Sequence, residues 1–371
     1  MKTYLAPISI VIMIGLASLF FTAPSNSKTP YYVTFNSEFE ANIEKKDLPA
    51  RSFIYAEKEP ISIIFAGDTL FDWSVKTAIQ TYGPDYPFKH IKDKVQEADL
   101  AVLNLETAVT TRGEKDTVQL YNFRSDPIAL KGVKNAGFDI VSLANNHALD
   151  YQEVGFYDTI HYLEEHDLSY FGAGESKAEA YEALSIEHKG RTIKFLGFSR
   201  FLPSVHWYEA KDRPVIASAY QPDLVLQAIE RESATADIVL VYMHWGVEGN
   251  NQPEQWQRVY AKNMIDAGAN AIIGAHPHVL QGFEFYEGKP IAYSLGNFLF
   301  PDYVSGKTAQ TGLLTLTIDK HDQLRMSFDP HVIQNNQIAP LSKEKQRDIL
   351  QYLKNISYDV TMEDTNILPG R

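Results

Sequence analysis

The sequence predicts an α/β protein in which strands and helices form layers. Short apolar runs alternate along the chain with longer stretches that have the apolar spacing of helices. This alternation is typical of an α/β layer architecture. Nearly every apolar run also ends in Asp, Glu, Asn or His. Because ligands of open α/β sheets bind beyond the carboxyl ends of the strands, we expect these polar side chains to converge on one site.

The predicted elements follow one another in a regular order. Apolar strands that open into polar loops are expected at residues 61–66, 99–105, 139–143, 237–243 and 271–274. Intervening helices are expected at residues 154–166 and 253–267. Further strands are expected at residues 290–294, 312–318, 324–328 and 331–334. Residues 341–353 predict a terminal helix, for which Ser342 is a candidate N-cap.

The composition is that of a globular protein and excludes several functional classes. The chain has 371 residues, of which 44% are hydrophobic and 22% charged, so a disordered or collagen-like chain is excluded. Asp and Glu number 47 against 34 Lys and Arg, and the net charge of −13 argues against nucleic acid as a partner. Cysteine is absent, which excludes disulfides, zinc–thiolate sites, iron–sulfur clusters and cysteine nucleophiles.

Residues 1–28 have the pattern of a signal sequence or membrane anchor. Lys2 precedes an uncharged stretch whose centre, residues 8–21 (ISIVIMIGLASLFF), is strongly apolar. Pro24 makes a poor context for cleavage after Ala23, and about 20 apolar residues suffice to span a bilayer. We expect a single anchor that places the body of the protein outside the cell membrane, or a secreted protein if the segment is cleaved. Residues 29–60 are polar and aperiodic, and predict a linker.

Seven polar residues at or just after the ends of predicted strands form the candidate site. They are Asp68, Glu106, Asn146, His147, His244, His276 and His278. Carboxylate, amide and imidazole together suit Mn, Fe or Zn better than Mg or Ca, and the set could hold one or two divalent ions. The strongest local signal is His276-Pro277-His278, because in an extended segment, which the proline favours at His276, both rings lie on one side.

Each candidate taken alone also has an ordinary structural explanation. A single Asp after a strand, such as Asp68, is commonly a turn residue or a helix cap. Glu106 could face solvent, and Asn145 with Asn146 fits a tight turn. His244 is harder to explain in this way, because it follows a fully apolar strand, where an unpaired imidazole is costly.

Several short motifs occur together in the order that one known family shows. They are Ala66-Gly67-Asp68, Asn104-Leu105-Glu106-Thr107, Phe123-Arg124 with Pro127, Ala144-Asn145-Asn146-His147-Ala148-Leu149-Asp150, Gly172-Ala173-Gly174, His244-Trp245-Gly246, Gly274-Ala275-His276-Pro277-His278-Val279 and Ser294-Leu295-Gly296-Asn297-Phe298. With them the chain resembles the CapA family of poly-γ-glutamate capsule-biosynthesis proteins, whose core is similar to the calcineurin-like metallophosphoesterases. The resemblance implies a four-layer α/β/β/α sandwich, with a CapA-like domain over residues 61–300 and residues 301–371 completing it.

The resemblance also implies a role for each candidate residue. It implies two metal ions, with Asp68 and His278 as ligands of one and Asn146, His244 and His276 as ligands of the other. Glu106 takes the place of the bridging carboxylate. His147 takes the place of the histidine that protonates the leaving group, a role for a group that titrates near neutrality. Arg124 could orient an anionic substrate, or form an ordinary surface ion pair.

The first motif departs from the pattern of classical phosphoesterases. Those proteins have Asp-x-His, whereas this chain has Asp68-Thr69-Leu70. The first metal ion therefore lacks one ligand unless Asp72 supplies it. This departure bears on phosphoesterase activity and leaves the fold prediction unchanged.

Three functional interpretations follow. The resemblance and the predicted anchor favour an extracellular component for making or exporting an anionic polyamide capsule, with a polymer ligase and small multi-span membrane subunits as partners. A self-standing hydrolase of phosphoesters or amides would instead use a metal-activated water, with His147 as general acid. A metal-free scaffold would need neither Asp68 nor His244.

Overall fold

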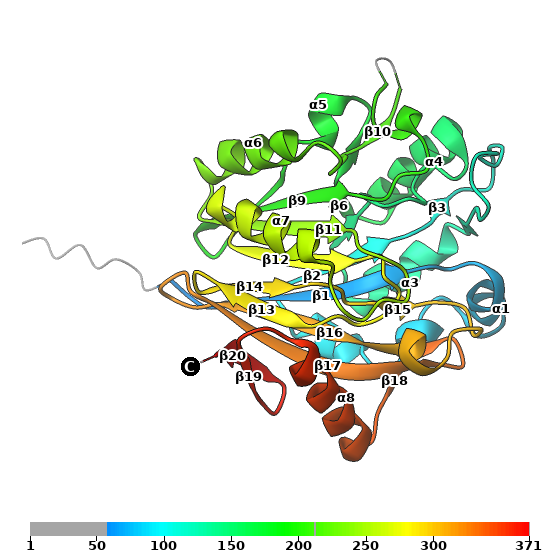
Figure 1. Cartoon of the computed structure of the whole chain (residues 1–371). Coiled ribbons are helices and arrows are strands. Elements are labelled where there is room, and N and C mark those ends of the chain that lie inside the picture. Colours follow the sequence, from blue (N-terminus) through cyan, green and yellow to red (C-terminus); the bar gives the residue numbers. More distant parts are fainter. Residues whose placement is uncertain (1–57, 211–212, 371) are drawn as a thin grey trace, which may run out of the picture. The chain divides into compact units, whose positions relative to one another are not determined.

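Two β-sheets lie face to face at the centre of the computed structural model, which describes residues 58–210 and 213–370 (Figure 1). The predicted anchor and nearly all of the predicted linker lie outside the described residues. Within the described part of the chain, no helix combines the length and the apolar character that a membrane span requires.

The first sheet has ten strands, in the order β19-β20-β17-β16-β1-β2-β5-β6, with β15 beside β1 and β18 beside β17. Its strands are β1 (Ile61–Thr69), β2 (Leu100–Leu105), β5 (Ile140–Ser142), β6 (Ser169–Phe171), β15 (Asn297–Leu299), β16 (Gln310–Ile318), β17 (Leu324–Gln334), β18 (Gln337–Pro340), β19 (Val360–Glu363) and β20 (Asn366–Pro369). Strands β1, β2, β5 and β6 are parallel, so their carboxyl ends meet at one edge.

The second sheet has six strands, in the order β13-β14-β12-β11-β9-β8. Its strands are β8 (Leu184–His188), β9 (Arg191–Ser199), β11 (Ile238–His244), β12 (Ala271–Ala275), β13 (Phe283–Tyr286) and β14 (Lys289–Ala292). Strands β9, β11, β12 and β14 are parallel, which again collects carboxyl ends at one edge. Two short pairs stand apart from both sheets, β3 (Ala108–Val109) with β4 (Arg124–Ser125) and β7 (Ala173–Gly174) with β10 (Val215–Ile216).

Helices cover the outer faces of both sheets. They are α1 (Trp73–Tyr82), α2 (Lys92–Gln96), α3 (Ile128–Ala136), α4 (Gln152–Glu165), α5 (Lys177–Ala180), α6 (Pro222–Ser233), α7 (Gln255–Asp266) and α8 (Lys343–Ile356), with 3₁₀ turns at Tyr86–Phe88, Val205–Trp207 and Gly306–Ala309. Helices α1 to α4 pack on the first sheet, and α6 and α7 pack on the second. Helix α8 closes the core between the sheets.

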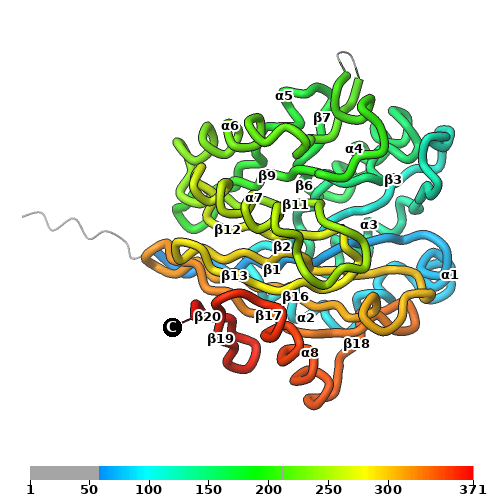
Figure 2. Tube along the Cα trace, in the orientation of Figure 1, coloured from blue at the N-terminus to red at the C-terminus, as the bar shows by residue number. Residues whose placement is uncertain are grey.

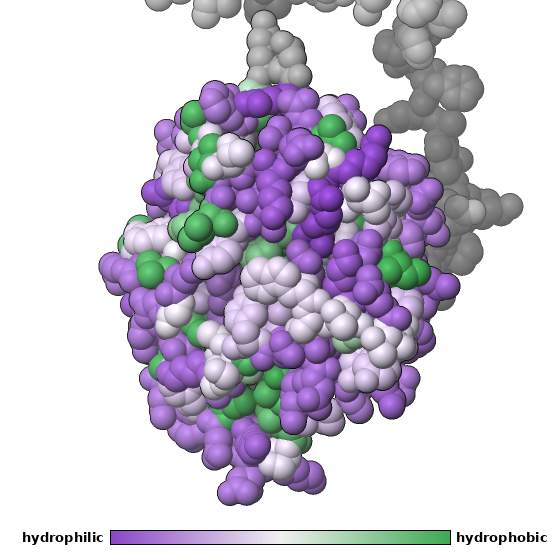
Figure 3. Space-filling view, turned by 90° about the vertical axis from the view of Figure 1, so that its right-hand side faces the viewer, coloured by the Kyte–Doolittle hydropathy of each residue, from purple (hydrophilic) through white to green (hydrophobic). Residues whose placement is uncertain are grey.

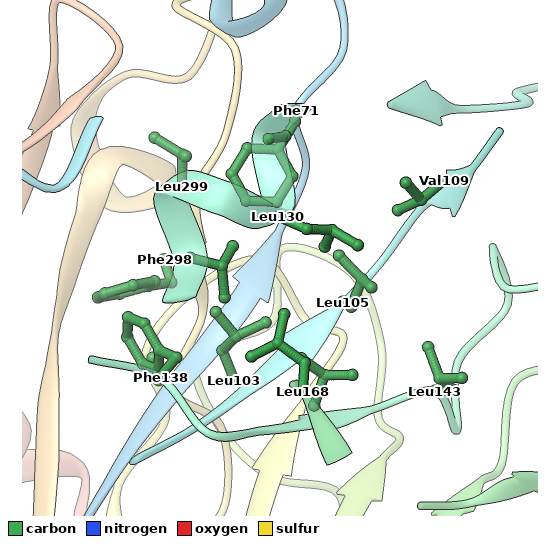
Figure 4. Close-up of a cluster of buried hydrophobic side chains, with 14 of the residues drawn as sticks. Phe71, Leu103, Leu105, Val109, Leu130, Phe138, Leu143, Leu168, Phe298 and Leu299 are labelled. Atoms are coloured by element: carbon green, nitrogen blue, oxygen red, sulfur yellow. The ribbon is translucent and has the colours of Figure 1, made fainter. Parts of the chain in front are cut away.

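Three buried clusters separate the four layers. One lies between the sheets, where Phe65 contacts the rings of Phe195 and Tyr242. A second fills the space between the first sheet and its helices, and Figure 4 shows part of it, including Leu103 and Phe138. A third lies under α6 and α7. The predicted four-layer α/β/β/α sandwich is therefore confirmed.

Local chemistry explains where the helices begin and end. The Ser342 side chain accepts a hydrogen bond from the backbone N–H of Lys345, as expected of an N-cap of α8. Glu254 and Gln257 form a capping box at the start of α7. Helix α3 ends at Gly137, whose φ of 103° is a left-handed conformation that glycine adopts without steric cost.

One strand prediction was wrong in a way that has a physical reason. Residues 324–328 and 331–334 were expected to form separate strands, but β17 runs without a break through Pro330. Proline has no N–H for a sheet ladder, so it normally marks an edge or an interruption. On one side, Pro330 lies opposite Gly312 of β16. On the other side, β20 pairs only with Met326 and Ser327, and the pairing of β17 with β18 begins only at His331. Pro330 therefore lies where neither β20 nor β18 pairs with that side of β17.

Candidate metal centre

The carboxyl ends of strands from both sheets meet at one edge of the sandwich. Asp68 lies near the end of β1, Glu106 directly follows β2, and His244 ends β11. His276 follows β12, which lies beside β1 although the two strands are far apart in sequence (Figure 2). The sequence prediction that polar residues at strand ends converge therefore agrees with the arrangement of the chain.

Four side-chain atoms surround one point in this cluster. The Nε2 atom of His244 lies 2.7 Å from Oδ1 of Asn146 and 3.0 Å from Nδ1 of His276. The same Nε2 lies 3.4 Å from Oε1 of Glu106. All four atoms carry lone pairs in their usual metal-binding forms, and such a convergence is the arrangement that a cation requires.

A second group shares Glu106 with the first. Asp68, Glu106 and His278 each offer a ligand atom, and these atoms lie within 4.8 Å of one another. The Nδ1 atom of His278 is 3.4 Å from Oδ2 of Asp68. The two groups divide the candidates in the way that the resemblance implies, with Glu106 in the common position.

Several atoms of the cluster are buried without a hydrogen-bonding partner among the described residues. They are both carboxylate oxygens of Glu106 and Nε2 of His276. An unpaired buried carboxylate is costly, and a divalent cation would remove that cost. The buried His, Asp and Glu side chains therefore fit a divalent metal site, at which the metal would supply a Lewis acid.

The environment sets the protonation of the cluster. Burial and the neighbouring Asp68 carboxylate raise the pKa of Glu106 well above its usual value. Burial lowers the pKa values of His244 and His276, and nearby histidines lower them further, which favours the neutral imidazole that binds metals. Burial alone would lower the pKa of His278 too, but the Glu106 and Asp68 carboxylates outweigh it and raise that pKa to about 10.

The backbone at the histidine pair differs from the prediction. An extended segment was expected at His276-Pro277-His278, but His276 has a φ of 98° and His278 a φ of 56°. Positive φ is uncommon outside glycine and costs about 1–3 kcal/mol where it is strained. The backbone N–H of His276 donates to Oδ2 of Asp68 at 3.1 Å, which helps to hold this turn. The turn, and not an extended strand, directs both rings into the cluster.

The chain is similar over most of its length to known proteins. The family described as "Bacterial capsule synthesis protein PGA_cap" matches residues 62–302 of the chain. The chain belongs to the PGA_cap family. It is 33% identical to the capsule biosynthesis protein CapA of Bacillus anthracis over 82% of this chain and 75% of that one. It is 32% identical to the PGA biosynthesis protein CapA of Bacillus subtilis over 82% of this chain and 80% of that one.

The family prediction made from the motifs is thus confirmed. Among solved structures, a hypothetical protein from Thermus thermophilus is similar over 73% of this chain and 98% of that one, with 18% identity and a TM-score of 0.45. A likeness at that level adds no argument about function. The domain boundaries at residues 28, 60 and 300 stay predictions.

Asparagines that had no assigned role support the cluster of this PGA_cap protein. Asn104 donates to Oδ1 of Asp68 at 2.8 Å, and Asn145 donates to Oδ1 of Asn104 at 3.0 Å. On the other side, Oδ1 of Asn297 lies 2.8 Å from Nδ1 of His278. The signal that could have found Asn104 is its place inside an otherwise apolar buried strand, where an amide needs partners.

The candidate acid His147 lies at the edge of the cluster and is held by its own loop. Its Nδ1 is 2.7 Å from Oδ2 of Asp150, three residues later, and its ring lies 4.2 Å from that of Phe123. Its Nε2 is 3.1 Å from the amide nitrogen of Asn146. With Nδ1 donating to Asp150, Nε2 carries the lone pair of the ring and accepts from the Asn146 amide. Asp150 lies in the segment from Ala144 to Asp150, but no role for it could be predicted from the sequence.

Asp72 was considered as a metal ligand and Arg124 as a substrate-binding residue, but both side chains have other partners in the structure. The carboxylate of Asp72 accepts hydrogen bonds from the backbone N–H groups of Trp73 and Arg124, so it caps α1 and is not a substitute ligand. The guanidinium of Arg124 donates to the carbonyls of Arg112 and Gly113 and lies over the ring of Tyr151. It forms no ion pair with a described residue, and its role toward an anionic substrate stays a prediction.

Leu70 shows what replaces the missing histidine of the first motif. It is fully buried in a small apolar cluster with Phe123, Phe300 and Ile333. The Asp68 group therefore contains one imidazole, that of His278, whereas the His244 group contains two.

A pocket of about 480 Å³ opens onto this centre, and His147, His278 and Asn297 are among the residues that line it. The carboxyl end of β1 and the start of α1 lie at the right of Figure 1. Figure 3 faces that side of the molecule, where hydrophilic side chains cover most of the surface and smaller hydrophobic patches lie between them.

Proposed function

We propose that this PGA_cap protein is an extracellular, membrane-anchored accessory component of poly-γ-glutamate capsule synthesis or export. Its relatives are named capsule biosynthesis and PGA biosynthesis proteins, and two mycobacterial relatives are named probable polyglutamine synthesis accessory proteins. The apolar segment at residues 8–21 supports the anchor. A polymer ligase and small multi-span membrane subunits are the proposed partners.

The observation that carries the proposal is the pair of ligand groups that share Glu106. A chain with a net charge of −13 repels a polyanion unless something positive lies between them. Bound Mn, Fe or Zn at this centre would provide that positive charge and bind carboxylates or amide oxygens of the polymer.

Removing metal ligands in cells tests the proposal. A deletion strain is complemented with the full-length protein, His276→Ala or Asp68→Ala, and with His321→Ala as a control at an exposed turn. We expect the two ligand variants to lose metal, measured on the purified protein by elemental analysis, and to lose the capsule polymer. If both variants make normal polymer, the metal-free scaffold is the correct interpretation.

A hydrolase is the second candidate, because the His147–Asp150 pair lies beside the cluster. In that role His147 would give a proton from Nε2 to the leaving group, while Asp150 keeps Nδ1 protonated. Purified protein is assayed on a generic phosphodiester and a γ-glutamyl amide, with and without Mn. Turnover that His147→Ala abolishes would support the hydrolase, whereas loss of capsule in the His276→Ala strain, without turnover by the wild-type protein, would support the assembly role.

A further inference from the structure

The pocket above the metal centre has a wall of aromatic rings. Trp73, Tyr121, Phe123, Phe300 and Tyr303 all line it. Trp73 lies between Phe123 and Tyr303, with ring centroids 5.6 and 5.5 Å apart. Trp73, Tyr121 and Tyr303 are 46%, 59% and 58% exposed, which is high for large aromatic side chains. These faces are available to a ligand.

The aromatic wall is continuous with the cluster. Phe123 contacts the ring of His147 at 4.2 Å, and Phe300 contacts the ring of His278 at 5.0 Å. A ligand held against Trp73 and Tyr303 would therefore lie beside these two histidines.

Apart from His147 and His278, the charged side chain among the described residues that line the pocket is a carboxylate, that of Glu248. Glu248 lines it, is exposed, and makes no hydrogen bond or ion pair with a described residue. Partial burial, together with the negative charges of Glu106 and Glu248, raises the pKa of Tyr303 to about 12. No Lys or Arg is among the described residues that line the pocket.

From this arrangement we propose that the pocket binds an ammonium group, held on the faces of Trp73, Tyr121 and Tyr303 and paired with Glu248. Ring faces attract cations through their quadrupole, and a carboxylate adds direct attraction. A carboxylate in the same position would be repelled by Glu248 and would gain nothing from the rings. A neutral group would gain only contact area.

The pocket would also distinguish one part of the polymer from the rest, a step that rests on the proposed function. In a γ-linked glutamate chain every residue keeps a free carboxylate, but only the amino-terminal residue keeps an ammonium group. The pocket therefore selects the amino end of the chain, and the adjacent carboxylate or amide lies toward the cluster.

Three small molecules of similar shape, one cationic, one neutral and one anionic, test whether the pocket prefers a cation. Choline, 3,3-dimethylbutan-1-ol and 3,3-dimethylbutanoate are titrated into the full-length protein labelled with 5-fluorotryptophan, in a non-ionic detergent. The chain has four tryptophans, so the ¹⁹F spectrum is simple, and Trp73→Phe assigns the resonance of interest. Trp256, which lies 5.7 Å from the guanidinium of Arg200, is an internal control.

We expect choline to shift the Trp73 resonance and to bind at least about fivefold tighter than the alcohol. Glu248→Gln, an exposed change that keeps the shape, should remove most of that preference, whereas Glu287→Gln at the β13–β14 turn should not. Equal or tighter binding of the alcohol or the butanoate, or no binding of choline, would overturn the inference.

A second pair of probes separates the pocket from the polymer. γ-Glutamylglutamate should shift the Trp73 resonance, and its N-acetyl derivative, which lacks the ammonium group, should not. If choline binds as expected and the two dipeptides behave alike, the amine pocket stands and its assignment to a polymer end is wrong.

Discussion

Glu106 is the residue on which the centre depends most. Its carboxylate is buried without a hydrogen-bonding partner among the described residues, and it belongs to both ligand groups. Burial and Asp68 raise its pKa, so in the metal-free protein its ionised form opposes folding at neutral pH. A raised folded pKa means that stability is greatest below the unfolded value of 4.5 and is lost as the pH rises toward the folded value.

The first prediction concerns Glu106→Gln. In the presence of a chelator at pH 8, this variant should be more stable to urea than the wild type by about 1–3 kcal/mol, because it removes a buried charge. The gain should shrink as the pH is lowered toward 5. Added divalent metal should stabilise the wild type and not the variant.

Glu344→Gln on α8 provides the control for this comparison, because Glu344 is exposed and its replacement should change stability by less than about 0.5 kcal/mol. A Glu106→Gln protein that is less stable than the wild type in chelator would show that the carboxylate has a partner of its own.

Among elements, β1 and β2 matter most because they carry Asp68 and Glu106. Asp99, just before β2, fixes their relative position: its Oδ2 accepts from the backbone N–H of Ser62 at 2.8 Å. Lys189 and His188, from the β8–β9 turn of the other sheet, also contact Asp99. Burial opposes the charge, but Lys189, Ser62 and His188 outweigh it and hold the pKa of Asp99 well below its usual value.

The second prediction follows from that depressed pKa. The stability that Asp99 contributes is fully present above its unfolded value near 3.8, and it is lost as the pH falls below that value. Asp99→Asn should therefore cost about 1–3 kcal/mol at pH 6 and less at pH 2.5, where part of the contribution is already lost, as measured by urea unfolding. Asp93→Asn, at an exposed position of α2, should cost little at either pH; a pH-independent cost for Asp99→Asn would contradict the prediction.

In the molecule as a whole, Arg191 connects the two sheets. It is fully buried at the start of β9, and its guanidinium donates to Oδ1 of Asp322 and to the carbonyl of Asp319, in the turn between β16 and β17. Its third partner is the carbonyl of Glu59, before β1. One side chain thus satisfies acceptors from the first sheet and fixes the second sheet against it.

The third prediction is that Arg191→Met costs about 3–5 kcal/mol, because it removes the donor to the carbonyls of Glu59 and Asp319 and to the partly exposed Asp322 carboxylate. Thermal unfolding followed by circular dichroism should still show one transition, at a lower temperature. Arg347→Met, at an exposed position of α8, should leave the transition unchanged. A small effect of Arg191→Met would mean that water replaces the guanidinium.

The helices and strands nearest the site were the easiest to predict. Strands such as β1, β2 and β11 are almost entirely buried and appear in the sequence as nearly continuous apolar runs, and their order implied the layers. Strand β9 was missed because Arg191, Thr192 and Lys194 interrupt its apolar residues. Its position between β8 and β11 is held by Arg191, whose partners Glu59, Asp319 and Asp322 all lie more than 120 residues away in the chain.

The alternation of apolar runs with helical stretches is a local property, so the fold class and the gathering of polar strand ends could be derived without coordinates. The motifs added the family and the candidate ligands. The direction of each side chain depends on contacts between distant segments. Only the tertiary structure therefore decided that Asp72 caps a helix, that the His276–His278 segment turns, and that Glu248 lines the same pocket as the aromatic rings.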